Sequence, residues 1–402
     1  MAGISLAQRI SLPRRVVFRI ILLTFGSQLS TFNQSAMKRV LAYLFLLSIC
    51  LAPAGCSGAA GTARWSEAKA ARWEARTPWL RGCNYTPSNA INQLEMWQEE
   101  TFSPELIDKE LGWAEELGFN CMRVFLHHLV WEQDRDGFVG RMDRYLEIAS
   151  SHGIRTMFVF LDDCWDAHAA LGPQREPRKG VHNSGWLKDP GALYFGDPTD
   201  PDFRVDTAAI LGTLERYMKD ILTTFGKDRR VVCWDLYNEP GGGAPNRYGE
   251  RSLPLLREVF RWAWEVRPSQ PLTVAVWTSR FPEISRFVAE NSDIISYHTY
   301  DPPGEHLDMI ENRLPKGRPM ICTEYMARPF GSTFQTVMPM LKEKHIGAIN
   351  WGFVAGKTQT YYPWGSQEGS EEPEVWFHDI LRADGTPFSE EEVRIIKLYT
   401  GK

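Results

Sequence analysis

The stretch VVCWDLYNEP at residues 231–240 is a short apolar run that ends in a carboxylate, Glu239. A second stretch of the same design, MICTEY at residues 320–325, leads to Glu324. Short apolar runs bounded by turn residues are typical of buried strands, so each carboxylate is expected at the carboxyl end of a strand. In a barrel of eight parallel strands, that end of the sheet carries the active site.

Apolar strands and amphipathic helices alternate along the rest of the chain. The expected strands are 79–85, 119–127, 154–162, 230–238, 271–277, 293–300, 318–324 and 347–354. The expected helices are 104–117, 141–152, 205–225, 251–266, 280–290, 304–313, 332–344 and 389–399. Because alternation of this kind favours a parallel sheet, we predict an α/β fold, a single (β/α)8 TIM barrel over residues 78–402.

Residues 1–56 carry the pattern of a secretory leader. Lys38 and Arg39 precede a nearly continuous apolar stretch, 40–51, and small residues then lead to Cys56. These three features define a signal peptide, and the apolar stretch is short for a membrane span. The Ala-Gly-Cys ending resembles the lipobox of bacterial lipoproteins, although Pro53 stands where Leu is usual, and it makes Cys56 the candidate lipidation site.

We therefore expect a leader over 1–56 that is cleaved or lipid-anchored, and a polar linker over 57–77. The protein would be secreted or held at the cell envelope, and it would meet a membrane only through the lipid anchor. A single anchoring helix is the alternative for the leader. Residues 1–36 are explained either by an upstream start codon or by an extended leader.

Charge and cysteine content exclude several classes of partner. Without residues 1–55 the chain keeps 39 basic and 50 acidic side chains, a net charge of −11. This leaves no basic footprint for nucleic acid, whereas a neutral polysaccharide is compatible. The seven Cys include no C-x-x-C pair, so no zinc site is expected, and those beyond Cys56 are expected to be mostly buried, with one disulfide as an option.

The two carboxylates point to one kind of chemistry. Cleavage of a glycosidic bond needs one carboxyl group to protonate the departing oxygen and another to attack the anomeric carbon. The 15 Trp suit this interpretation because flat aromatic faces stack on sugar rings, but they equally suit an aromatic core.

With these motifs the chain resembles the clan A glycoside hydrolases, most closely the family 5 cellulases, mannanases and their relatives. The resemblance covers about residues 79–400. The clan has Asn-Glu at the end of the fourth strand and a second Glu at the end of the seventh, as here. The matched positions, in order along the chain, are Arg123, Asn238 with Glu239, His298 with Tyr300, Glu324, and Trp351.

The resemblance implies roles for the catalytic pair. Glu239 would be the general acid/base, its pKa raised by the charge of Glu324 and by partial burial. Glu324 would be the nucleophile, held in its ionised form by Arg123. A buried structural ion pair is the competing interpretation of Glu324 with Arg123.

The resemblance also implies a set of sugar-binding side chains. Asn238 would bond the sugar 2-hydroxyl, Tyr300 would donate to Glu324, and His298 would orient the polar network of the cleft. Trp351 would form the floor of the sugar site by stacking. The competing interpretations are an Asn satisfied within a turn for Asn238, a core His-Tyr pair for His298 and Tyr300, and a core Trp for the last residue.

The third strand departs from the family pattern. Many family members carry a His near the third or fourth strand, whereas this strand leads into Asp162 and Trp165, at the start of a long irregular stretch, 162–204. We expect both to contact sugar, with a structural loop Asp as the alternative for Asp162. Of the pair His127 and His128, we expect His127 to face the cleft, because it shares strand parity with Arg123.

The sequence thus predicts a retaining β-glycoside hydrolase acting on a β-linked neutral polysaccharide or oligosaccharide of xylan, mannan or glucan type. No metal-ligand spacing is present, so neither a metal nor a cofactor is expected. The alternatives are a transglycosylase with the same carboxylates and a non-catalytic glycan-binding lipoprotein. The loops 162–204 and 355–388 would decide whether the site is an open groove or a closed pocket.

Overall fold

The computed structural model describes residues 64–200, 202–243 and 247–402. The expected leader, Cys56 and the start of the linker lie outside the described residues, so their cleavage and lipidation stay predictions. Within the described part, no helix combines the length and the apolar character needed to cross a membrane.

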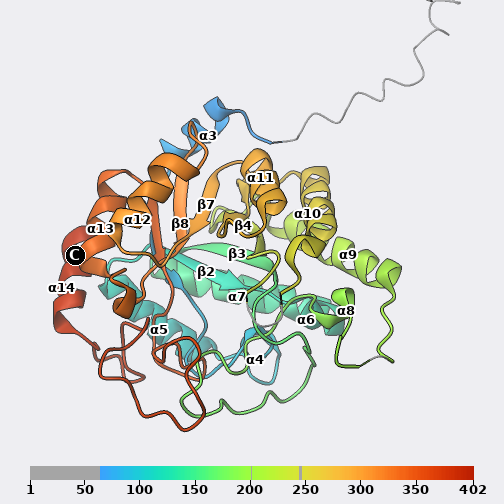
Figure 1. Cartoon of the computed structure of the whole chain (residues 1–402), viewed down its shortest axis with the longest axis horizontal. Helices are drawn as coiled ribbons and strands as arrows, with labels where there is room; N and C mark the ends of the chain where they lie inside the picture. Colours follow the sequence, from blue (N-terminus) through green and yellow to red (C-terminus); the bar gives the residue numbers. More distant parts are fainter. Residues whose placement is uncertain (1–63, 201, 244–246) are drawn as a thin grey trace, which may run out of the picture. The chain divides into compact units, whose positions relative to one another are not determined.

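One parallel sheet forms the centre of the fold, and its strands follow the order β5-β4-β3-β2-β1-β9-β8-β7-β6 (Figure 1). β5 and β6 are separated only by Val274; β5 pairs with β4, and β6 pairs with β7. The two therefore act as one interrupted strand that brings the ends of the sheet together. The expected (β/α)8 barrel is confirmed as a barrel-shaped parallel sheet. The strands are β1 Arg81–Asn84, β2 Cys121–Phe125, β3 Arg155–Asp162, β4 Val231–Asn238, β5 Leu272–Thr273, β6 Ala275–Val276, β7 Ile295–His298, β8 Met320–Glu324 and β9 Gly347–Asn350.

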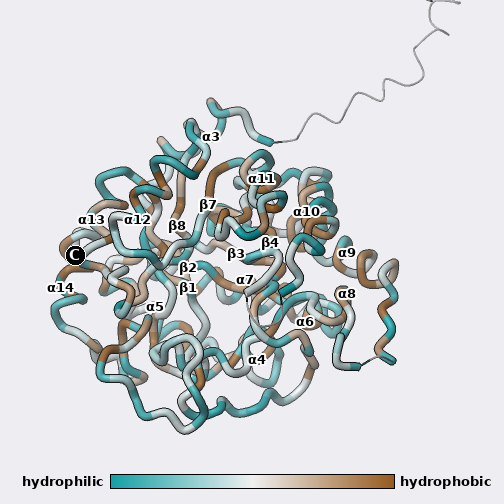
Figure 2. The backbone as a smooth tube through the Cα atoms, in the orientation of Figure 1, coloured by the Kyte–Doolittle hydropathy of each residue, from teal (hydrophilic) through white to brown (hydrophobic). Residues whose placement is uncertain are grey.

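Helices surround the sheet, and every expected helix has a counterpart. Their bounds are α5 Pro104–Glu116, α7 Arg135–Ser151, α9 Thr207–Phe225, α10 Leu253–Val266, α11 Pro282–Asn291, α12 Pro303–Asp308 continued by η2 Met309–Arg313, α13 Phe334–Glu343 and α14 Glu390–Thr400. Short elements that the sequence did not predict are α4 Gln93–Trp97, α6 His128–Gln133, α8 Ala192–Phe195, η1 Gly249–Ser252 and η3 Arg328–Phe330. In Figure 2 hydrophobic colour lies along β7 and β8 and recurs within the helices, as expected for helices that cover a sheet.

A further helix, α3 (Glu67–Glu74), occupies part of the stretch expected to be a linker. Trp65 and Ala70 are buried in a cluster with Leu80, Ile294 and Ile349, and the Trp65 backbone N–H donates to Asp293 Oδ1 at 2.6 Å. The folded unit therefore includes at least residues 65–77. The sequence did not predict α3, because its few buried positions lie among many Ala and Arg residues.

The aromatic residues divide between core and surface. Trp97, Trp234 and Trp262 are fully buried, whereas Trp165 and Trp364 are about 40% exposed. The five described cysteines are all free, and only Cys164 is not fully buried. The interpretation as an aromatic core is confirmed for the buried Trp residues, whereas stacking on sugar stays a prediction for the exposed ones. The disulfide option is not used within the described chain.

Candidate active site

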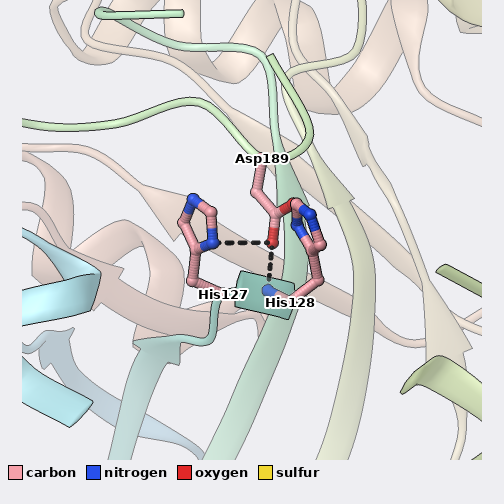
Figure 3. Close-up of side chains that lie close together, drawn as sticks. All are labelled: His127, His128 and Asp189. Atoms are coloured by element: carbon pink, nitrogen blue, oxygen red, sulfur yellow. Dashed lines mark hydrogen bonds and ion pairs between the residues drawn. The ribbon is translucent and has the colours of Figure 1, made fainter. Parts of the chain in front are cut away.

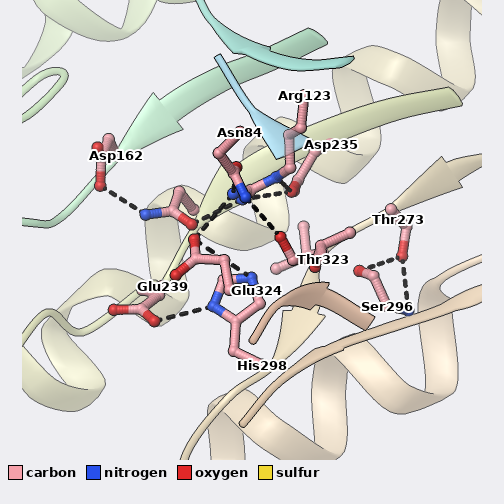
Figure 4. A network of polar contacts seen from close by, with 12 residues as sticks. Asn84, Arg123, Asp162, Asp235, Glu239, Thr273, Ser296, His298, Thr323 and Glu324 are labelled. Atoms are coloured by element: carbon pink, nitrogen blue, oxygen red, sulfur yellow. Dashed lines mark hydrogen bonds and ion pairs between the residues drawn. The ribbon is translucent and has the colours of Figure 1, made fainter. Parts of the chain in front are cut away.

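The two catalytic candidates lie at the carboxyl ends of strands on opposite parts of the barrel (Figure 4). Glu324 is the last residue of β8, and Glu239 directly follows β4. Glu239 has φ 44°, a left-handed conformation that costs energy for a residue with a Cβ and that is often found at functional sites. One carboxylate oxygen of each, and one ring nitrogen of His298, lie within 4.8 Å of one another.

Arg123 on β2 holds the nucleophile candidate from inside the barrel. Its guanidinium donates to Glu324 Oε1 at 2.8 Å and to Asp235 Oδ2 at 2.8 and 3.0 Å. It also donates to Asn84 Oδ1 and Asn238 Oδ1, both at 2.7 Å. Its charge is thus balanced by two carboxylates, as a buried cation requires.

Asp235 and Asn84 were not predicted as site residues. Asp235 breaks the apolar run of β4, and a fully buried carboxylate inside a strand needs a charged partner. That signal was available in the sequence, whereas nothing there identified Asn84.

Glu324 receives a second donor, the Tyr300 hydroxyl, at 2.7 Å from Oε2. Burial is the main cause that raises the pKa of Glu324, and the nearby Glu239 carboxylate adds to the rise. His298, the charge of Arg123 and the hydrogen bond from Tyr300 act in the opposite direction by favouring the ionised form. Both oxygens are thereby oriented, which suits a nucleophile.

Glu239 is held differently. His298 Nδ1 lies 2.8 Å from its Oε1, and the Cys164 thiol donates to Oε2 at 3.1 Å. Burial raises the pKa of Glu239, and the bond from Cys164 acts against this rise. Glu239 lacks the direct arginine contact of Glu324, so of the two it is the better placed to carry a proton.

His298 stands between the two carboxylates, since its Nε2 lies 3.6 Å from Glu324 Oε1. Burial lowers the pKa of His298 to about 4, so a neutral imidazole is the form present near neutral pH. A neutral ring can serve one carboxylate as a donor without adding a charge to the pair.

Asn238 is oriented by hydrogen bonds within the protein. The Asn238 amide donates to Asp162 Oδ1 at 2.9 Å, and Trp186 Nε1 donates to Asp162 Oδ2 at 2.8 Å. Both oxygens of Asp162 are therefore occupied within the protein, and burial raises its pKa to about 7. The structure places Asp162 behind Asn238, in the structural role that was the alternative.

His127 does not face the carboxylates. β2 ends at Phe125, so the strand parity counted from Arg123 stops before His127, which precedes α6 as its N-cap. Its side chain is fully buried, with Nδ1 3.7 Å from Asp189 Oδ2 (Figure 3). His128 also contacts Asp189 through its ring and backbone N–H, so both histidines fix the loop that carries Asp189.

Among the described residues, two groups could offer several ligand atoms to a metal. They are His127 with His128 and Asp189, and Glu239 with His298 and Glu324. In the first group, Asp189 already accepts from His128 through both oxygens. In the second, Arg123 and Tyr300 occupy Glu324. The expectation of no metal stays a prediction.

Three tryptophans follow the carboxyl ends of strands: Trp351 comes directly after β9, and Trp165 and Trp364 lie in the long loops after β3 and β9. Trp351, after β9, makes edge-on contacts with Phe125 and Trp186, each with ring centroids 5.9 Å apart. Trp165 stacks on His182 at 5.4 Å. Trp364, which sequence reasoning placed only in a loop, packs edge-on against Tyr300 at 4.8 Å. Exposed faces of this kind are suited to stacking on sugar rings.

No protein-family model matches the sequence, and no curated protein matches it. Solved structures of proteins with glycoside hydrolase names do match the fold. A GH5_18 protein from Streptomyces cattleya, a glutamate-to-alanine variant in complex with Manβ1-4GlcNAc, is 13% identical over 81% of this chain and 80% of that chain, with a TM-score of 0.53.

Two further structures carry names for opposite modes of action. The endo-β-1,4-mannanase from Thermotoga petrophila is 14% identical over 81% of this chain and 77% of that chain, with a TM-score of 0.50. The exo-β-1,4-mannosidase Op5Man5 from Opitutaceae bacterium strain TAV5 is 16% identical over 80% of this chain and 60% of that chain, with a TM-score of 0.52. At these identities the likeness establishes only the fold, a (β/α)8 barrel like those of family 5 enzymes. Any inference about function must rest on the residues of the site.

Cys164 gives the first test of the site. Replacing it with Ala removes the thiol that stabilises the ionised form of Glu239, so the pKa of Glu239 rises further. The acid would then keep its proton to higher pH, and the alkaline limb of the kcat/KM profile is expected to move to higher pH. Cys164→Ser, which keeps a donor, should leave that limb near its original position. An unmoved limb in Cys164→Ala would show that the thiol does not act on Glu239.

Proposed function

We propose that this protein is a retaining β-glycoside hydrolase. The observation that carries the proposal is the close approach of two carboxylates that are held differently. Arg123 and Tyr300 donate hydrogen bonds to Glu324, and neither of them donates to Glu239. Retaining enzymes hold their carboxyl groups about 5–5.5 Å apart, and inverting ones about 6.5–9.5 Å apart to admit a water. One oxygen of each carboxylate lies within 4.8 Å of the other, an approach compatible with the shorter separation.

In the first step Glu324 attacks the anomeric carbon while the bond to the leaving oxygen breaks. Glu239 gives its proton to that oxygen, so the leaving group departs as a neutral alcohol. The product is an ester between the sugar and Glu324. Asn238, fixed by Asp162 and Arg123, is placed to bond the 2-hydroxyl, a contact that strengthens in the transition state.

In the second step Glu239, now ionised, takes a proton from water, and the resulting hydroxide attacks the anomeric carbon. The ester bond breaks and Glu324 regains its carboxylate. Two inversions at one carbon give net retention. Trp351 lies at the end of β9 next to β8, which suits a stacking floor beneath the sugar.

The proposed substrate is a β-linked neutral polysaccharide or oligosaccharide. The three structural relatives described above are named for mannose-containing substrates or hold a mannose-containing ligand, which puts β-mannosides first, ahead of xylan and glucan types. The net charge of the chain is compatible with an uncharged substrate.

The test is turnover of 4-nitrophenyl β-mannoside, β-glucoside and β-xyloside, with NMR of the first anomer formed. We expect one glycoside to be hydrolysed and the β-anomer to appear before mutarotation. The α-anomer first would contradict the retaining mechanism. A folded protein that binds these sugars without cleaving any of them, or the matching oligosaccharides, would instead support the glycan-binding alternative.

A further inference from the structure

The carboxyl end of β3 contacts the turn that carries Glu239. The first residue after the strand, Asp163, is fully buried, and its backbone N–H donates to Asn238 O at 3.2 Å. Its side chain accepts from the N–H of Gly241, two residues after Glu239, at 2.7 Å. The next residue, Cys164, donates to the carboxylate of Glu239 itself. One short stretch of chain therefore holds the main chain on both sides of Glu239 and its side chain as well.

The backbone of this turn needs support from outside. Glu239, Gly241 and Gly242 all have positive φ, at 44°, 98° and 68°. For a residue with a Cβ such a conformation is sparsely populated, and it persists only where the surroundings impose it. Glycine tolerates it but leaves the chain free to adopt many others. The hydrogen bond from Gly242 N–H to Glu239 O closes the turn, but it does not fix the turn relative to the barrel.

The carboxyl group of Asp163 is suited to supply this support because both of its oxygens are held. The Tyr237 hydroxyl on β4 donates to Oδ1 at 2.7 Å, and the Ser252 hydroxyl at the end of η1 donates to Oδ2 at 2.6 Å. The Gly241 N–H, which donates to the same Oδ2, also lies 3.1 Å from Ser252 Oγ. The carboxyl group thus links residues before and after the turn, and its rotation would break several hydrogen bonds at once.

The main chain of Asp163 lies equally close to the turn. A Cβ at Gly242 would lie 2.5 Å from Asp163 O, so there is no room for a side chain at that position. The turn and the end of β3 therefore pack backbone against backbone, and a displacement of one is transmitted to the other.

The carboxyl group of Asp163 is ionised near neutral pH. Burial raises its pKa to about 6, and the bonds from Ser252, Gly241 and Tyr237 and the charge of Lys188 act against the rise. An ionised carboxylate has two acceptor oxygens and can serve all three donors. Hydrogen bonds to a charged group are also stronger than those between neutral groups, which suits an anchor for a mobile glycine-containing turn.

We propose that Asp163 is the positioning residue of the general acid: it fixes the turn after Glu239, so that the proton of Glu239 points at the departing oxygen. The inference rests on the proposed function and adds to it a buried residue that acts through Glu239. A displacement of a reacting group by about 1 Å can lower the rate about 100-fold, which sets the scale of the expected effect.

The test compares two aryl glycosides of the sugar that the glycoside panel identifies, one with a phenyl and one with a 2,4-dinitrophenyl leaving group. Phenolate leaves poorly without a proton, whereas 2,4-dinitrophenolate needs none. Asp163→Ala is therefore expected to lower kcat/KM about 100-fold for the phenyl glycoside and by no more than about threefold for the dinitrophenyl glycoside. Because kcat/KM reports the first chemical step, the role of Glu239 as base in the second step does not enter.

An active-site count separates positioning from folding. The 2,4-dinitrophenyl 2-deoxy-2-fluoroglycoside forms the glycosyl ester but releases it slowly, so its burst of 2,4-dinitrophenolate counts the competent sites. Rates are divided by this count. A purely structural role of Asp163 would lower the count, or would lower the rates for both leaving groups equally, and either result without a selective loss on the phenyl glycoside would overturn the inference.

Asp163→Asn provides the rescue. Its amide oxygen can take the place of Oδ2 and accept from Gly241 N–H and Ser252, while its NH2 group faces the Tyr237 hydroxyl, which can accept. This variant should regain most of the activity on the phenyl glycoside that Asp163→Ala loses.

Asp293→Ala is the matched control. Asp293 is also fully buried, and it accepts from the N–H groups of Trp65 at 2.6 Å and Leu272 at 2.8 Å, at the amino ends of β5 and β7. The substitution removes a similarly bonded carboxylate from the opposite end of the sheet. Any loss of activity in this variant should be equal for the two leaving groups.

A double variant covers the case in which Asp163→Ala does not fold. Tyr237→Phe with Ser252→Ala removes the two hydroxyls that orient the carboxyl group and leaves no buried donor unpaired. We expect its kcat/KM to fall about tenfold for the phenyl glycoside, as for the loss of one or two hydrogen bonds, and to change little for the dinitrophenyl glycoside. An equal change for both would reject the role of Asp163.

The unchanged protein separates the two levels of failure. If it hydrolyses an aryl glycoside and the variants lose activity on both leaving groups equally, the proposed function stands and only the role of Asp163 is rejected. If the folded protein hydrolyses no aryl glycoside of any sugar on the panel, the proposed function itself is rejected.

Discussion

Glu324→Gln is expected to lower kcat by about 10⁴-fold or more on every substrate, because the amide cannot form the glycosyl ester. The substitution keeps the shape of the side chain and an oxygen for Arg123, so the fold and substrate binding should persist. The measurement is kcat from initial rates, with circular dichroism to verify folding. Glu343→Gln, an exposed residue near the end of α13, is the control and should retain full activity.

Azide makes this prediction more specific. In Glu324→Ala the vacated space admits azide to the face of the sugar from which the carboxylate attacked, so an α-glycosyl azide is expected from an activated aryl glycoside. Retained activity in Glu324→Gln, or a β-glycosyl azide from Glu324→Ala, would contradict the assignment of Glu324 as nucleophile.

Glu239→Ala is expected to have an effect that depends on the leaving group. A sugar alcohol leaves poorly without a proton, so hydrolysis of oligosaccharides should fall by about 10²–10⁴-fold, the usual contribution of a general acid. A 4-nitrophenolate needs no proton to leave, so the first step on aryl glycosides should change far less. The glycosyl ester then accumulates, because Glu239 is also the base for its hydrolysis.

The measurement is a burst of 4-nitrophenolate followed by a slow steady rate, which azide should accelerate with formation of a β-glycosyl azide. Cys164→Ser, which keeps a donor to the Glu239 position, serves as the control and should show no burst. An equal loss on aryl glycosides and oligosaccharides would show that Glu239 is not the acid.

The barrel could be predicted from the sequence because its information is local. Each strand is an apolar run with turn residues at its ends, and each helix repeats its apolar residues with helical spacing. The carboxylates at 239 and 324 then followed from the end of the sheet at which parallel strands place their last residues. The family resemblance placed Arg123, His298, Tyr300 and Trp351, and the structure brings Arg123, His298 and Tyr300 into contact with the carboxylate pair.

The predictions that failed concern strand ends and contacts between residues that are distant in the sequence. His127 was assigned by strand parity, which fails once the strand ends at Phe125. Asp162 was expected to bind sugar, but Asn238 and Trp186 occupy its oxygens from other parts of the chain. Cys164 looked like a small apolar residue, and only the left-handed turn at Glu239 brings a carboxylate to its thiol.

The pairing of the two long loops, residues 163–200 and 351–388, lay furthest from the sequence. It depends on hydrogen bonds between backbone groups of loops about 175 residues apart, such as the Asn183 N–H with Thr358 O. Backbone groups are the same in every residue, so their pairing leaves no pattern of residue types to recognise.

The pairing of β1 with β9 has a consequence for synthesis on the ribosome. Arg81 aligns with Ala348, and Cys83 with Asn350. The ring of strands can therefore close only after β9, the last strand, has been synthesised. Contacts so distant along the chain form late and slowly. Until then a nascent chain exposes an unpaired edge of β1, which invites association with other chains. Residues 351–388, which follow β9, emerge later still, so both candidate carboxylates are synthesised before the loop that hydrogen-bonds to residues 163–200.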